Sequence, residues 1–588
     1  MTRNIPFLLI VIALAAPFVL PGTYYIYLAE LVVIYAIAAL GVRQFLATTN
    51  QLVFCQSAMM AIGAYSFALT ARQFGDGITG LFIGLVAGLI ISGAVSMALI
   101  FPALRLRGPY FAMITIAFGW IVWRTAIEWT AVTGGDLGIS AIPNFAAALG
   151  LPPSAQYVAS LAVLAAVSGI LWRIGNSAFG VLQLAHSVDT MALAALGVRV
   201  DHIRLIAFVA GSCIGALAGA FFAMHQAYIN PNGFEVFDSV SLLVAVLIGG
   251  VSRQVGTVIG VIAIYIAPEF LHALDAYRLL FYGALVLLML NFAREGLLRD
   301  NRSQIWRRPF HGTGAVGGLV SWLEELHPGP RHTHLKISGV QKHFGTIRAL
   351  GGVDLDVRAG EVHGVVGPNG SGKSTLLDVA SGLVPRDGGS VTLNDLKLPR
   401  EGVDRIARYD MLRTFQKIRN FDTLTCRENV LAGIVAQRFR TSTFGIFRAM
   451  ANRVATRDEE RAQAILGSLG LAAHSDDLAA ALPQGRRRAL EIARILAAGP
   501  RVLLLDEPTS GLSRDERDEI ARAILLCRDH GIAVILVDHD MELIEHLCDQ
   551  VTALSVGRVI AQGSPQAVLA DERFKADYFG GGERDVDA

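Results

Sequence analysis

The stretch EVHGVVGPNGSGKSTLLDVASGL, residues 361–383, decides the fold of the second half of the chain. It reads as an apolar strand, a glycine-rich turn and a helix, and the turn meets the spacing GxxxxGK[ST] through Gly367, Gly372, Lys373 and Ser374. Glycines let backbone N–H groups curl around phosphate oxygens at a helix N-terminus, where the helix dipole favours anions. The stretch therefore predicts an α/β nucleotide-binding domain, in which Lys373 reaches the β- and γ-phosphates and Ser374 holds Mg²⁺.

Two further buried-type strands follow this turn. RVLLLDEP (501–508) ends in two carboxylates, of which Asp506 suits a Mg²⁺ shell and Glu507 suits the polarisation of an attacking water. A plain strand with a solvated acidic turn is the alternative, and the phosphate-binding turn upstream disfavours it. AVILVDHDM (533–541) places His539 just past a strand, where it can touch a γ-phosphate.

The first half of the chain has a different composition. Residues 1–300 contain thirteen arginines, twelve acidic residues and no lysine, whereas the remaining 288 positions hold the other 74 charged residues. The first half is therefore of a membrane type and the second of an ordinary soluble type. The overall net charge of +1 gives no support to nucleic-acid binding.

Apolar runs predict about ten membrane segments in the first half. They lie near 5–20, 24–42, 51–71, 79–101, 110–130, 155–172, 203–229, 239–250, 256–270 and 274–293. The run 239–270 is too long for one span, and the glycine-rich stretch GGVSRQVG (249–256) divides it into two segments, of which the first is short and fits a re-entrant segment. The first segment is interpreted as a span and not as a cleaved signal, because more spans follow at once.

Arginines in the loops predict the orientation. With the N-terminus inside, the outer loops carry only Arg72 and Arg278. The inner loops carry Arg3, Arg43, Arg105, Arg107, Arg173, Arg199, Arg253, Arg294 and Arg299. This positive-inside bias places the second half of the chain in the cytoplasm.

Three features of the membrane half leave alternatives open. Arg124 and Glu128 lie four apart in one span and form either part of a functional path or a self-paired couple near the outer interface. His225 and Gln226, near the outer end of their span, are either interfacial, which is the expectation, or ligand-binding. LQLAHSVDTMALAALGV (182–198) fits an amphipathic helix at the cytoplasmic surface, which is either a simple connector or an element that transmits force.

Between the halves the chain turns basic and then rich in Gly, Pro and His, which predicts a flexible linker at 301–332. Within it, VSWLEEL (320–326) fits a helical turn.

Over about residues 335–580 the motifs resemble the ATP-binding domain of ABC transporters. In this resemblance Lys373 matches the Walker A lysine, Asp506 and Glu507 match Walker B, and His539 matches the switch histidine. The resemblance implies ATP hydrolysis, with ATP and Mg²⁺ as cofactors.

The same resemblance adds residues that no single motif identifies. Gln416 in LRTFQKIRN matches the Q-loop glutamine, which implies a catalytic role and a place among the Mg²⁺ ligands beside Ser374 and Asp506. Phe344 matches the aromatic residue that stacks on adenine. The residues expected to bind the nucleotide are Phe344, Gly367, Pro368, Asn369, Gly370, Ser371, Gly372, Lys373, Ser374 and Thr375.

LPQGRRRALEIAR (482–494) stands where such a domain carries its signature, and it resembles the signature of the branched-chain amino acid importer ATPases, commonly LPxGxxRxLEIAR. The residues expected to meet the ATP of a partner subunit are Leu482, Pro483, Gln484 and Gly485. The usual serine is absent at Pro483, and Ser513 in the D-loop stands where Asp or Asn is more usual. The pattern implies a complete Walker set beside a weaker signature.

The membrane half resembles the permease of the same importers across most of 30–300. The stretches that carry this resemblance are LRLRGPYFAMITIAFG (104–119), TGGDLGIS (133–140), ALGV (195–198) and LIGGVSRQVGTVIG (247–260). In that family the loop before ALGV docks onto the ATPase and usually carries several acidic residues, of which Asp189 is present here. The order predicts a fusion of two normally separate subunits.

The expected fold is an all-α polytopic membrane domain of about ten segments at 1–300, followed after the linker by an α/β P-loop ABC ATPase domain at 333–584. The resemblance implies ATP-driven import of a small amino-acid-like solute, with branched-chain amino acids first, across a bacterial inner membrane. Urea, short amides and aromatic acids are alternative solutes, and an ABC exporter half or an ATP-gated channel are alternative functions. The implied partners are the lipid bilayer, a periplasmic solute-binding protein, and either a second permease and a second ABC ATPase or a second copy of this chain.

Overall fold

The structure, a computed structural model, describes residues 23–75, 77–104, 106, 108–266, 318–326, 332–440, 450 and 454–579. Contacts divide the described residues into two compact units. The membrane unit comprises 23–175 and 201–266, and the ATPase unit comprises 176–200 together with 318–579. Residues 176–200 thus belong to the ATPase unit, although membrane-unit helices precede and follow them in the sequence.

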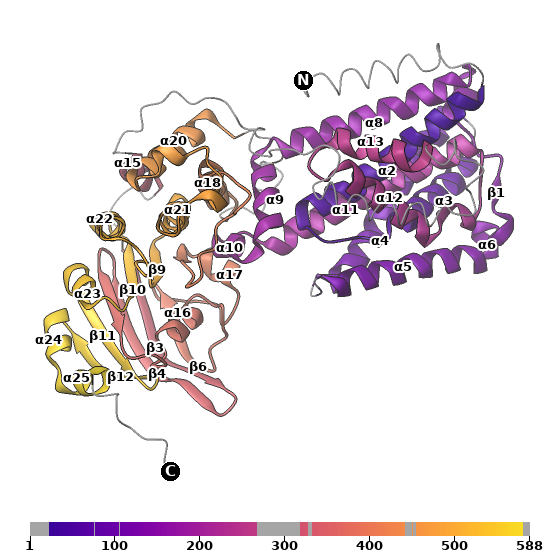
Figure 1. Cartoon of the computed structure of the whole chain (residues 1–588). Coiled ribbons are helices and arrows are strands. Elements are labelled where there is room, and N and C mark those ends of the chain that lie inside the picture. Colours follow the sequence, from indigo (N-terminus) through magenta and orange to yellow (C-terminus); the bar gives the residue numbers. More distant parts are fainter. Residues whose placement is uncertain are drawn as a thin grey trace. The chain divides into compact units, whose positions relative to one another are not determined.

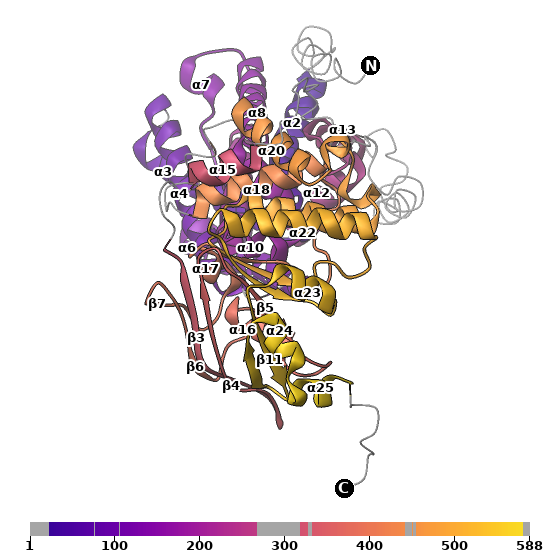
Figure 2. The same ribbon diagram turned by 90° about the vertical axis from the view of Figure 1, so that its left-hand side faces the viewer.

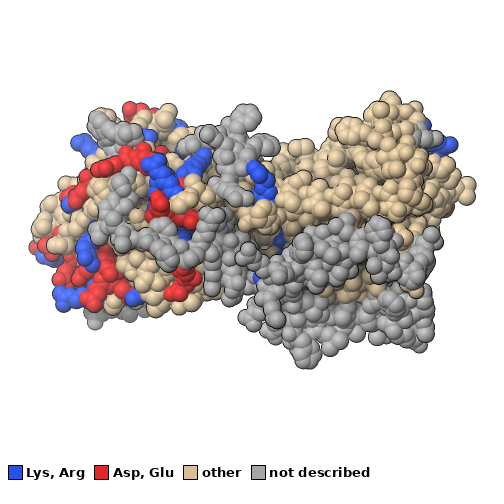
Figure 3. Space-filling model, turned by 90° about the horizontal axis from the view of Figure 1, so that it is seen from above, with Lys and Arg blue, Asp and Glu red and all other residues tan. Residues whose placement is uncertain are grey.

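The membrane unit is built mainly from helices (Figure 1), and the expected all-α fold is corrected by one short antiparallel pair of strands, β1 with β2. Its elements are α2 (Thr23–Thr49), α3 (Gln56–Phe74), α4 (Ile78–Ala103), α5 (Pro109–Glu128), α6 (Thr130–Thr133), η2 (Gly135–Leu137), β1 (Ile139–Ser140), α7 (Phe145–Leu149), α8 (Ser154–Gly175), α11 (Val200–Gln226), β2 (Tyr228–Ile229), η3 (Pro231–Phe234), α12 (Val236–Gly249) and α13 (Gln254–Ile266). Among the described residues, six segments are long and apolar enough to cross a membrane, namely α2, α4, α5, α8, α11 and η3 with α12. On the face seen in Figure 3, charged side chains are sparse on the membrane unit and frequent on the ATPase unit.

Most of the predicted membrane segments coincide with helices, and the predicted segments 5–20 and 274–293 lie outside the described residues. The predicted break at 249–256 is confirmed, because α12 ends at Gly249 and α13 begins at Gln254. A Cβ on Gly249 would stand 1.8 Å from the carbonyl oxygen of Gly256. The two helices therefore approach so closely that only glycine fits at this position.

Glu30 in α2 is a buried acidic residue that no sequence pattern singled out. Its carboxylate accepts a hydrogen bond from Ser160 Oγ in α8 at 3.0 Å and pairs with His225 Nδ1 in α11 at 3.0 Å. The side chains of His225 and Glu30 are only 3% and 6% exposed. A carboxylate from another helix therefore gives the imidazole of His225 a buried partner, a contact that the sequence did not predict.

Arg124 and Glu128 form an ion pair along the last turn of α5, and their side chains are 65% and 62% exposed. Of the two arrangements left open by the sequence, this is the self-paired couple.

The ATPase unit combines two sheets with surrounding helices (Figures 1 and 2). Its strands are β3 (His334–Phe344), β4 (Ile347–Arg358), β5 (Val362–Val366), β6 (Gly388–Leu393), β7 (Leu396–Lys397), β8 (Met411–Arg413), β9 (Val502–Asp506), β10 (Ala533–Val537), β11 (Gln550–Ser555) and β12 (Arg558–Gly563). Its helices are α9 (Ala178–Val188), α10 (Thr190–Ala195), α15 (Gly318–Leu326), α16 (Lys373–Ala380), α17 (Val403–Ala407), α18 (Cys426–Arg440), α20 (Thr456–Ser468), α21 (Gln484–Ala497), α22 (Arg514–Asp529), α23 (Met541–Leu547), α24 (Pro565–Ala570) and α25 (Glu572–Phe579), with 3-10 turns η6 (Ala472–His474) and η7 (Ala479–Ala481).

The larger sheet has the order β12-β11-β5-β10-β9-β8, and the smaller antiparallel sheet has the order β4-β3-β6-β7. Strands β11, β5, β10, β9 and β8 run parallel, and β5, β9 and β10 are buried along their whole length. Such continuous apolar runs are typical of strands covered on both faces. Because Val537 is paired with Asp506, the residues that follow β9 and β10 emerge at the same edge of the sheet.

The predicted amphipathic helix at 182–198 is two helices. The helix is interrupted at Asp189, whose backbone is extended. Asp189 Oδ1 accepts hydrogen bonds from the N–H groups of Met191 and Ala192 at 2.9 and 3.0 Å. An aspartate in this conformation starts a new helix as its N-cap, so α9 ends at Val188 and α10 begins at Thr190. The described part of the predicted linker also contains a helix, α15, over 318–326, where the sequence predicted a helical turn.

Candidate active site

The phosphate-binding turn joins β5 to α16 at the carboxyl edge of the parallel strands. Gly367 has a φ of 151°, and a Cβ there would stand 2.2 Å from the carbonyl oxygen of Leu554. Gly372, which precedes the first residue of α16, has a φ of 103°. Both positions require glycine, because a side chain would collide with β11 or strain the backbone. The turn thus leads straight into a helix N-terminus, which offers backbone N–H groups to an anion.

Lys373 lies across this turn. Its ammonium donates to the carbonyl oxygens of Gly367 at 2.8 Å and Pro368 at 2.9 Å, and the residue is 6% exposed. Burial lowers the pKa of Lys373, an effect that the carboxylates of Glu507 and Asp506 oppose. An ammonium has three donors, and these two carbonyl groups leave one of them for a phosphate oxygen.

Asp506, the last residue of β9, is buried and carries an oxygen with no protein partner. Its Oδ1 accepts no hydrogen bond from the described residues, and its Oδ2 lies 3.9 Å from Arg413 Nη2. Burial raises the pKa of this carboxyl, Arg413 opposes the shift and Glu507 adds to it. A buried polar atom without a partner costs about 1–3 kcal/mol, and a carboxylate oxygen is a ligand that Mg²⁺ prefers. Asp506 therefore fits the divalent cation predicted for this site.

Glu507 follows Asp506 directly, and its backbone φ of 47° is strained for any residue other than glycine. Its N–H donates to Val537 O at 2.8 Å, so the strained residue is anchored to the neighbouring strand. The side chain then reaches His539, and Oε1 lies 2.8 Å from Nε2. Strain of this kind persists where the surrounding structure imposes it, often at functional positions.

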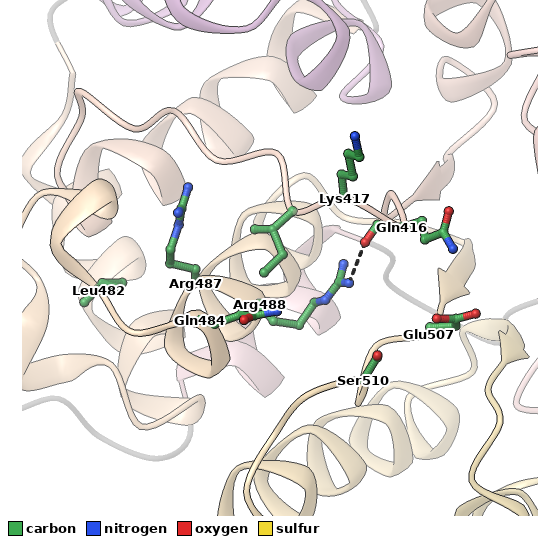
Figure 4. A pocket seen from close by; sticks show the side chains of 9 residues that line it. Gln416, Lys417, Leu482, Gln484, Arg487, Arg488, Glu507 and Ser510 are labelled. Carbon is green, nitrogen blue, oxygen red and sulfur yellow. Dashed lines mark hydrogen bonds between the residues drawn. The ribbon is translucent and has the colours of Figure 1, made fainter.

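Gln416, Glu507 and the start of the signature helix line one pocket of about 550 Å³ (Figure 4). The lining residues are Gln416, Lys417, Ile418, Leu482, Gln484, Arg487, Arg488, Glu507 and Ser510. Four residues predicted from the sequence thus meet here, namely Gln416, Leu482, Gln484 and Glu507. The residues of the phosphate-binding turn do not line this pocket; they lie between β5 and α16.

Arg488 joins the signature helix to the loop that carries Gln416. Its Nη1 donates to Phe415 O at 2.7 Å. Its Nη2 donates to Gln416 O at 3.0 Å, which is the bond drawn in Figure 4. The same guanidinium pairs with Glu491 at 2.9 Å, and both side chains are almost fully buried. The sequence analysis quoted both residues within the signature but assigned no role to them; charged residues three apart in an apolar helix were the available signal.

The signature helix α21 begins at Gln484, and Pro483 at its N-cap offers no side-chain hydrogen bond. A Cβ on Gly485 would stand 2.1 Å from Glu516 Oε1. That carboxylate accepts the N–H of Ser513 at 3.0 Å and closes a capping box at the start of α22. Ser513 therefore caps its helix, and the same Glu516 carboxylate lies against Gly485 at the start of the signature helix.

Phe344 ends β3, and 48% of its surface is exposed. Lys342 Nζ lies 5.2 Å from the centroid of its ring. The ring is therefore accessible, as stacking on a planar base requires.

Residues 176–200 join the ATPase unit through an ion pair. Asp189 Oδ2 lies 2.9 Å from Arg419 Nη1. Arg419 follows Gln416 by three positions in the same loop, and its N–H donates to Glu491 Oε1 in α21 at 3.3 Å. No sequence pattern marks Arg419, because its acidic partner lies 230 positions away.

An apolar cluster lies beside this pair. Ala195 of α10 packs with Val403 of α17 and with Phe415, and Met191 and Leu383 border the cluster. Helix α9 packs on α18, and α10 packs on α17. The segment 176–200 therefore contacts the loop of Gln416 through both charged and apolar groups.

Residues 24–290 match the family model described as "Branched-chain amino acid transport system / permease component", and residues 350–510 match the model "ABC transporter". The high-affinity branched-chain amino acid transport ATP-binding protein LivG of Salmonella typhimurium is 34% identical over 249 residues, which are 42% of this chain and 97% of that protein. The corresponding protein BraF of Pseudomonas aeruginosa is 34% identical over 250 residues, which are 42% of this chain and 97% of that protein.

A phosphonates import ATP-binding protein, PhnC 1 of Rhodopseudomonas palustris, is 36% identical over 241 residues, which are 40% of this chain and 84% of that protein. Among solved structures, an ATP-binding cassette of an ABC transporter in its ADP conformation is 27% identical, covers 43% of this chain and 100% of that chain, and has a TM-score of 0.37.

The ATPase unit is thus an ATP hydrolase of the ABC type, in one chain with a helical membrane unit. The chain belongs to the ABC transporter family, and it joins a permease domain of the branched-chain amino acid transport type to an ABC ATP-binding domain whose hydrolysis of ATP is coupled to transport.

Proposed function

We propose that this chain is the permease and ATPase of an importer that takes up a small amino-acid-like solute, with branched-chain amino acids first, across the bacterial inner membrane. A periplasmic solute-binding protein would deliver the solute, and the ATPase unit would lie in the cytoplasm. A second permease and a second ABC ATPase, or a second copy of this chain, would complete the transporter. The match of residues 24–290 and the names of the LivG and BraF relatives support this proposal.

The observation that carries the proposal is the contact of residues 176–200 with the ATPase unit. This segment lies in the sequence between α8 and α11, which are both candidate membrane spans. Its Asp189 pairs with Arg419, in the loop whose Gln416 shares a pocket with Glu507. A change in that loop when nucleotide binds would therefore reach a segment that is covalently continuous with two membrane helices.

The residues of the site support the following division of roles. The turn 367–372 and Lys373 would hold the phosphates, and Phe344 would stack on adenine. Asp506, Ser374 and Gln416 would hold Mg²⁺, which neutralises phosphate charge when it is bound. Glu507 would accept a proton from the attacking water, and His539, at 2.8 Å from its carboxylate, would orient it.

Other solutes and functions remain as alternatives to test. Urea, short amides or aromatic acids would be handled by the same mechanism, whereas an ABC exporter half or an ATP-gated channel would use the same ATP site. The name of the PhnC relative assigns phosphonates to that protein, and its match covers 40% of this chain.

The test is solute uptake by the purified complex in liposomes, with the solute-binding protein encoded beside this chain. We expect ATP-dependent uphill uptake of leucine, isoleucine or valine that requires the binding protein. Efflux against a gradient would indicate an exporter, and downhill flux that persists without hydrolysis would indicate a channel.

A further inference from the structure

The described part of the predicted linker packs against the ATPase unit. Helix α15 lies against α20 and α21 (Figures 1 and 2). Leu319, Trp322 and Leu323 are 0%, 4% and 0% exposed, whereas Glu324 and Glu325 are exposed. The spacing i, i+3, i+4 places the three buried residues on one face of the helix. The linker helix therefore buries its apolar face on the ATPase unit.

Polar contacts fix the orientation of this helix. Trp322 Nε1 donates to Ala497 O at 3.1 Å, and the guanidinium of Arg461 in α20 lies 4.6 Å from the centroid of the Trp322 ring. Glu325 pairs with Arg461 and, at 3.4 Å, with Arg457. The hydrogen bond from Arg461 is the main cause that lowers the pKa of the Glu325 carboxyl. An unspecific apolar contact would require none of these groups.

The contact lies at the C-terminal end of the signature helix. Ala497 is the last residue of α21, so its carbonyl oxygen has no partner within the helix. The next carbonyl, of Ala498, accepts a hydrogen bond from Arg440 at 2.8 Å. Leu326 packs on Gly499, so that a Cβ added at Gly499 would stand 2.4 Å from Leu326 Cδ1. Trp322 and Arg440 together thus satisfy the last carbonyl groups of α21.

Helix α21 connects this contact to the signature. It has 14 residues, which corresponds to a rod about 21 Å long. Gly485 stands at its first turn and Ala497 at its last residue. Helix α18, which packs on α21, also packs on α9. The signature helix and its neighbours are therefore contacted by the segment 176–200, which lies in the sequence between two candidate membrane spans, and by α15 of the predicted linker.

We infer that α15 transmits movement of the signature helix to the linker through its contact with the C-terminal end of that helix. It would be a second such element beside the segment 176–200. A displacement of Gly485 toward or away from the nucleotide of a partner subunit moves the rigid rod, and α15 passes that movement to the linker. The chain is one polypeptide, so α15 is linked in sequence to the membrane unit, and its contact with α21 adds to the contact of Asp189 with Arg419. The inference rests on the proposed transport function.

Two pairs of variants test the inference in the full chain. Trp322→Ala removes the buried side chain, whereas Trp322→Phe keeps an aromatic ring under Arg461 and loses only the indole N–H. Glu325→Lys sets a positive charge against Arg457 and Arg461, whereas Glu324→Lys makes the same change at the exposed neighbour.

Hydrogen exchange reports docking and does not depend on transport. We expect the amides of 319–326 to exchange about tenfold faster in Trp322→Ala, which corresponds to about 1.4 kcal/mol. Glu325→Lys should change in the same direction, Trp322→Phe less, and Glu324→Lys not at all. In liposomes, the solute moved per ATP hydrolysed should fall about fivefold in Trp322→Ala, with ATP hydrolysis in detergent within about twofold of the parent.

Fast exchange of 319–326 in the parent protein would overturn the inference. So would faster exchange in Trp322→Ala together with an unchanged ratio of solute to ATP. If Trp322→Ala does not fold, the comparison of Glu325→Lys with Glu324→Lys tests the inference instead. The two measurements are again the exchange of 319–326 and the solute moved per ATP hydrolysed. A parent protein that hydrolyses ATP and moves no solute would instead contradict the proposed function, and the exchange of 319–326 would then decide the docking by itself.

Discussion

Asp189 and Arg419 lie 230 positions apart in the sequence, and the carboxylate of one stands 2.9 Å from the guanidinium of the other. Asp189 also starts α10 as its N-cap, and Arg419 also donates its N–H to Glu491 of the signature helix. Asp189 therefore determines where α10 begins in the segment 176–200, and it also binds this segment to the loop that carries Gln416. These two tasks are separable by substitution.

Asp189→Asn keeps an N-cap and removes the charge, whereas Asp189→Ala removes both. We expect solute uptake per ATP to fall about fivefold in Asp189→Asn, and further in Asp189→Ala because a lost cap costs about 1 kcal/mol. Uptake and ATP hydrolysis are measured in the same liposomes. Asp201→Asn, at an exposed position in the first turn of α11, is the control. Restored coupling in the double variant Asp189→Arg with Arg419→Asp supports the pair, and equal loss in Asp201→Asn contradicts it.

Glu507→Gln should bind ATP and lose hydrolysis by about 10²–10⁴-fold, because the amide cannot accept the proton of the attacking water. Lys373→Ala should lose nucleotide binding, since it removes the ammonium that the turn holds at 2.8 and 2.9 Å. ATP hydrolysis and nucleotide retention after gel filtration measure the two effects. Glu545→Gln, at an exposed position in α23, is the control. Full activity in Glu507→Gln would falsify the assignment.

Asp506→Asn should stabilise the nucleotide-free protein and abolish Mg²⁺-dependent hydrolysis. Burial raises the pKa of Asp506 in the folded state, so the folded state binds more protons than the unfolded state between the two pKa values. Stability therefore falls as pH rises through that window. The neutral amide avoids the cost of burying a charge, a gain of about 1–3 kcal/mol, at about 2–4 °C in Tm per kcal/mol for a domain of this size.

Thermal unfolding at pH 5 and pH 8, without nucleotide, measures this difference. The gain in Asp506→Asn should be larger at pH 8 and shrink at pH 5, where the native carboxyl moves toward its protonated form. A larger gain at pH 5 would show that the sign is wrong.

The predicted topology places Arg253 on the cytoplasmic side and Asp136 on the outer side. Arg253 lies in the turn between α12 and α13, where Ser252 O accepts a hydrogen bond from Arg43 at 2.8 Å, and Asp136 lies in η2. Arg253→Cys and Asp136→Cys, in a background without the five native cysteines, should label from the cytoplasmic and outer sides respectively. Labelling from the opposite sides contradicts the orientation inferred from the arginines.

The signature predicts two unequal ATP sites in a dimer with a different ATPase chain. Pro483 cannot donate the hydroxyl hydrogen bond of a serine, although the N-terminus of α21 still offers backbone N–H groups. Loss of one hydrogen bond to a charged phosphate costs about 1.5–3 kcal/mol, which is about ten- to a hundredfold in rate. Transport after the separate loss of each Walker B glutamate measures the difference. Equal losses, or a symmetric active dimer of this chain alone, would refute the asymmetry.

The nucleotide motifs could be predicted from the sequence because each is local. The turn 367–372 needs only its glycines and the following helix, and Asp506 and Glu507 end a strand whose five residues are all buried. The break at 249–256 was equally local, since glycine alone permits the approach of α12 and α13. These features depend on residues close together in the chain, so periodicity and spacing carried the signal.

Tertiary structure alone decided which distant side chains meet. The pairs of Asp189 with Arg419 and of Glu30 with His225 join elements that no periodicity relates. The sequence predicted a helical turn at 320–326 within a flexible linker, but it did not predict that three apolar residues of this helix are buried against α20 and α21. In each case the favourable contact exists only after packing has brought the partner close, because a buried charge or apolar face is stable only beside the group that satisfies it.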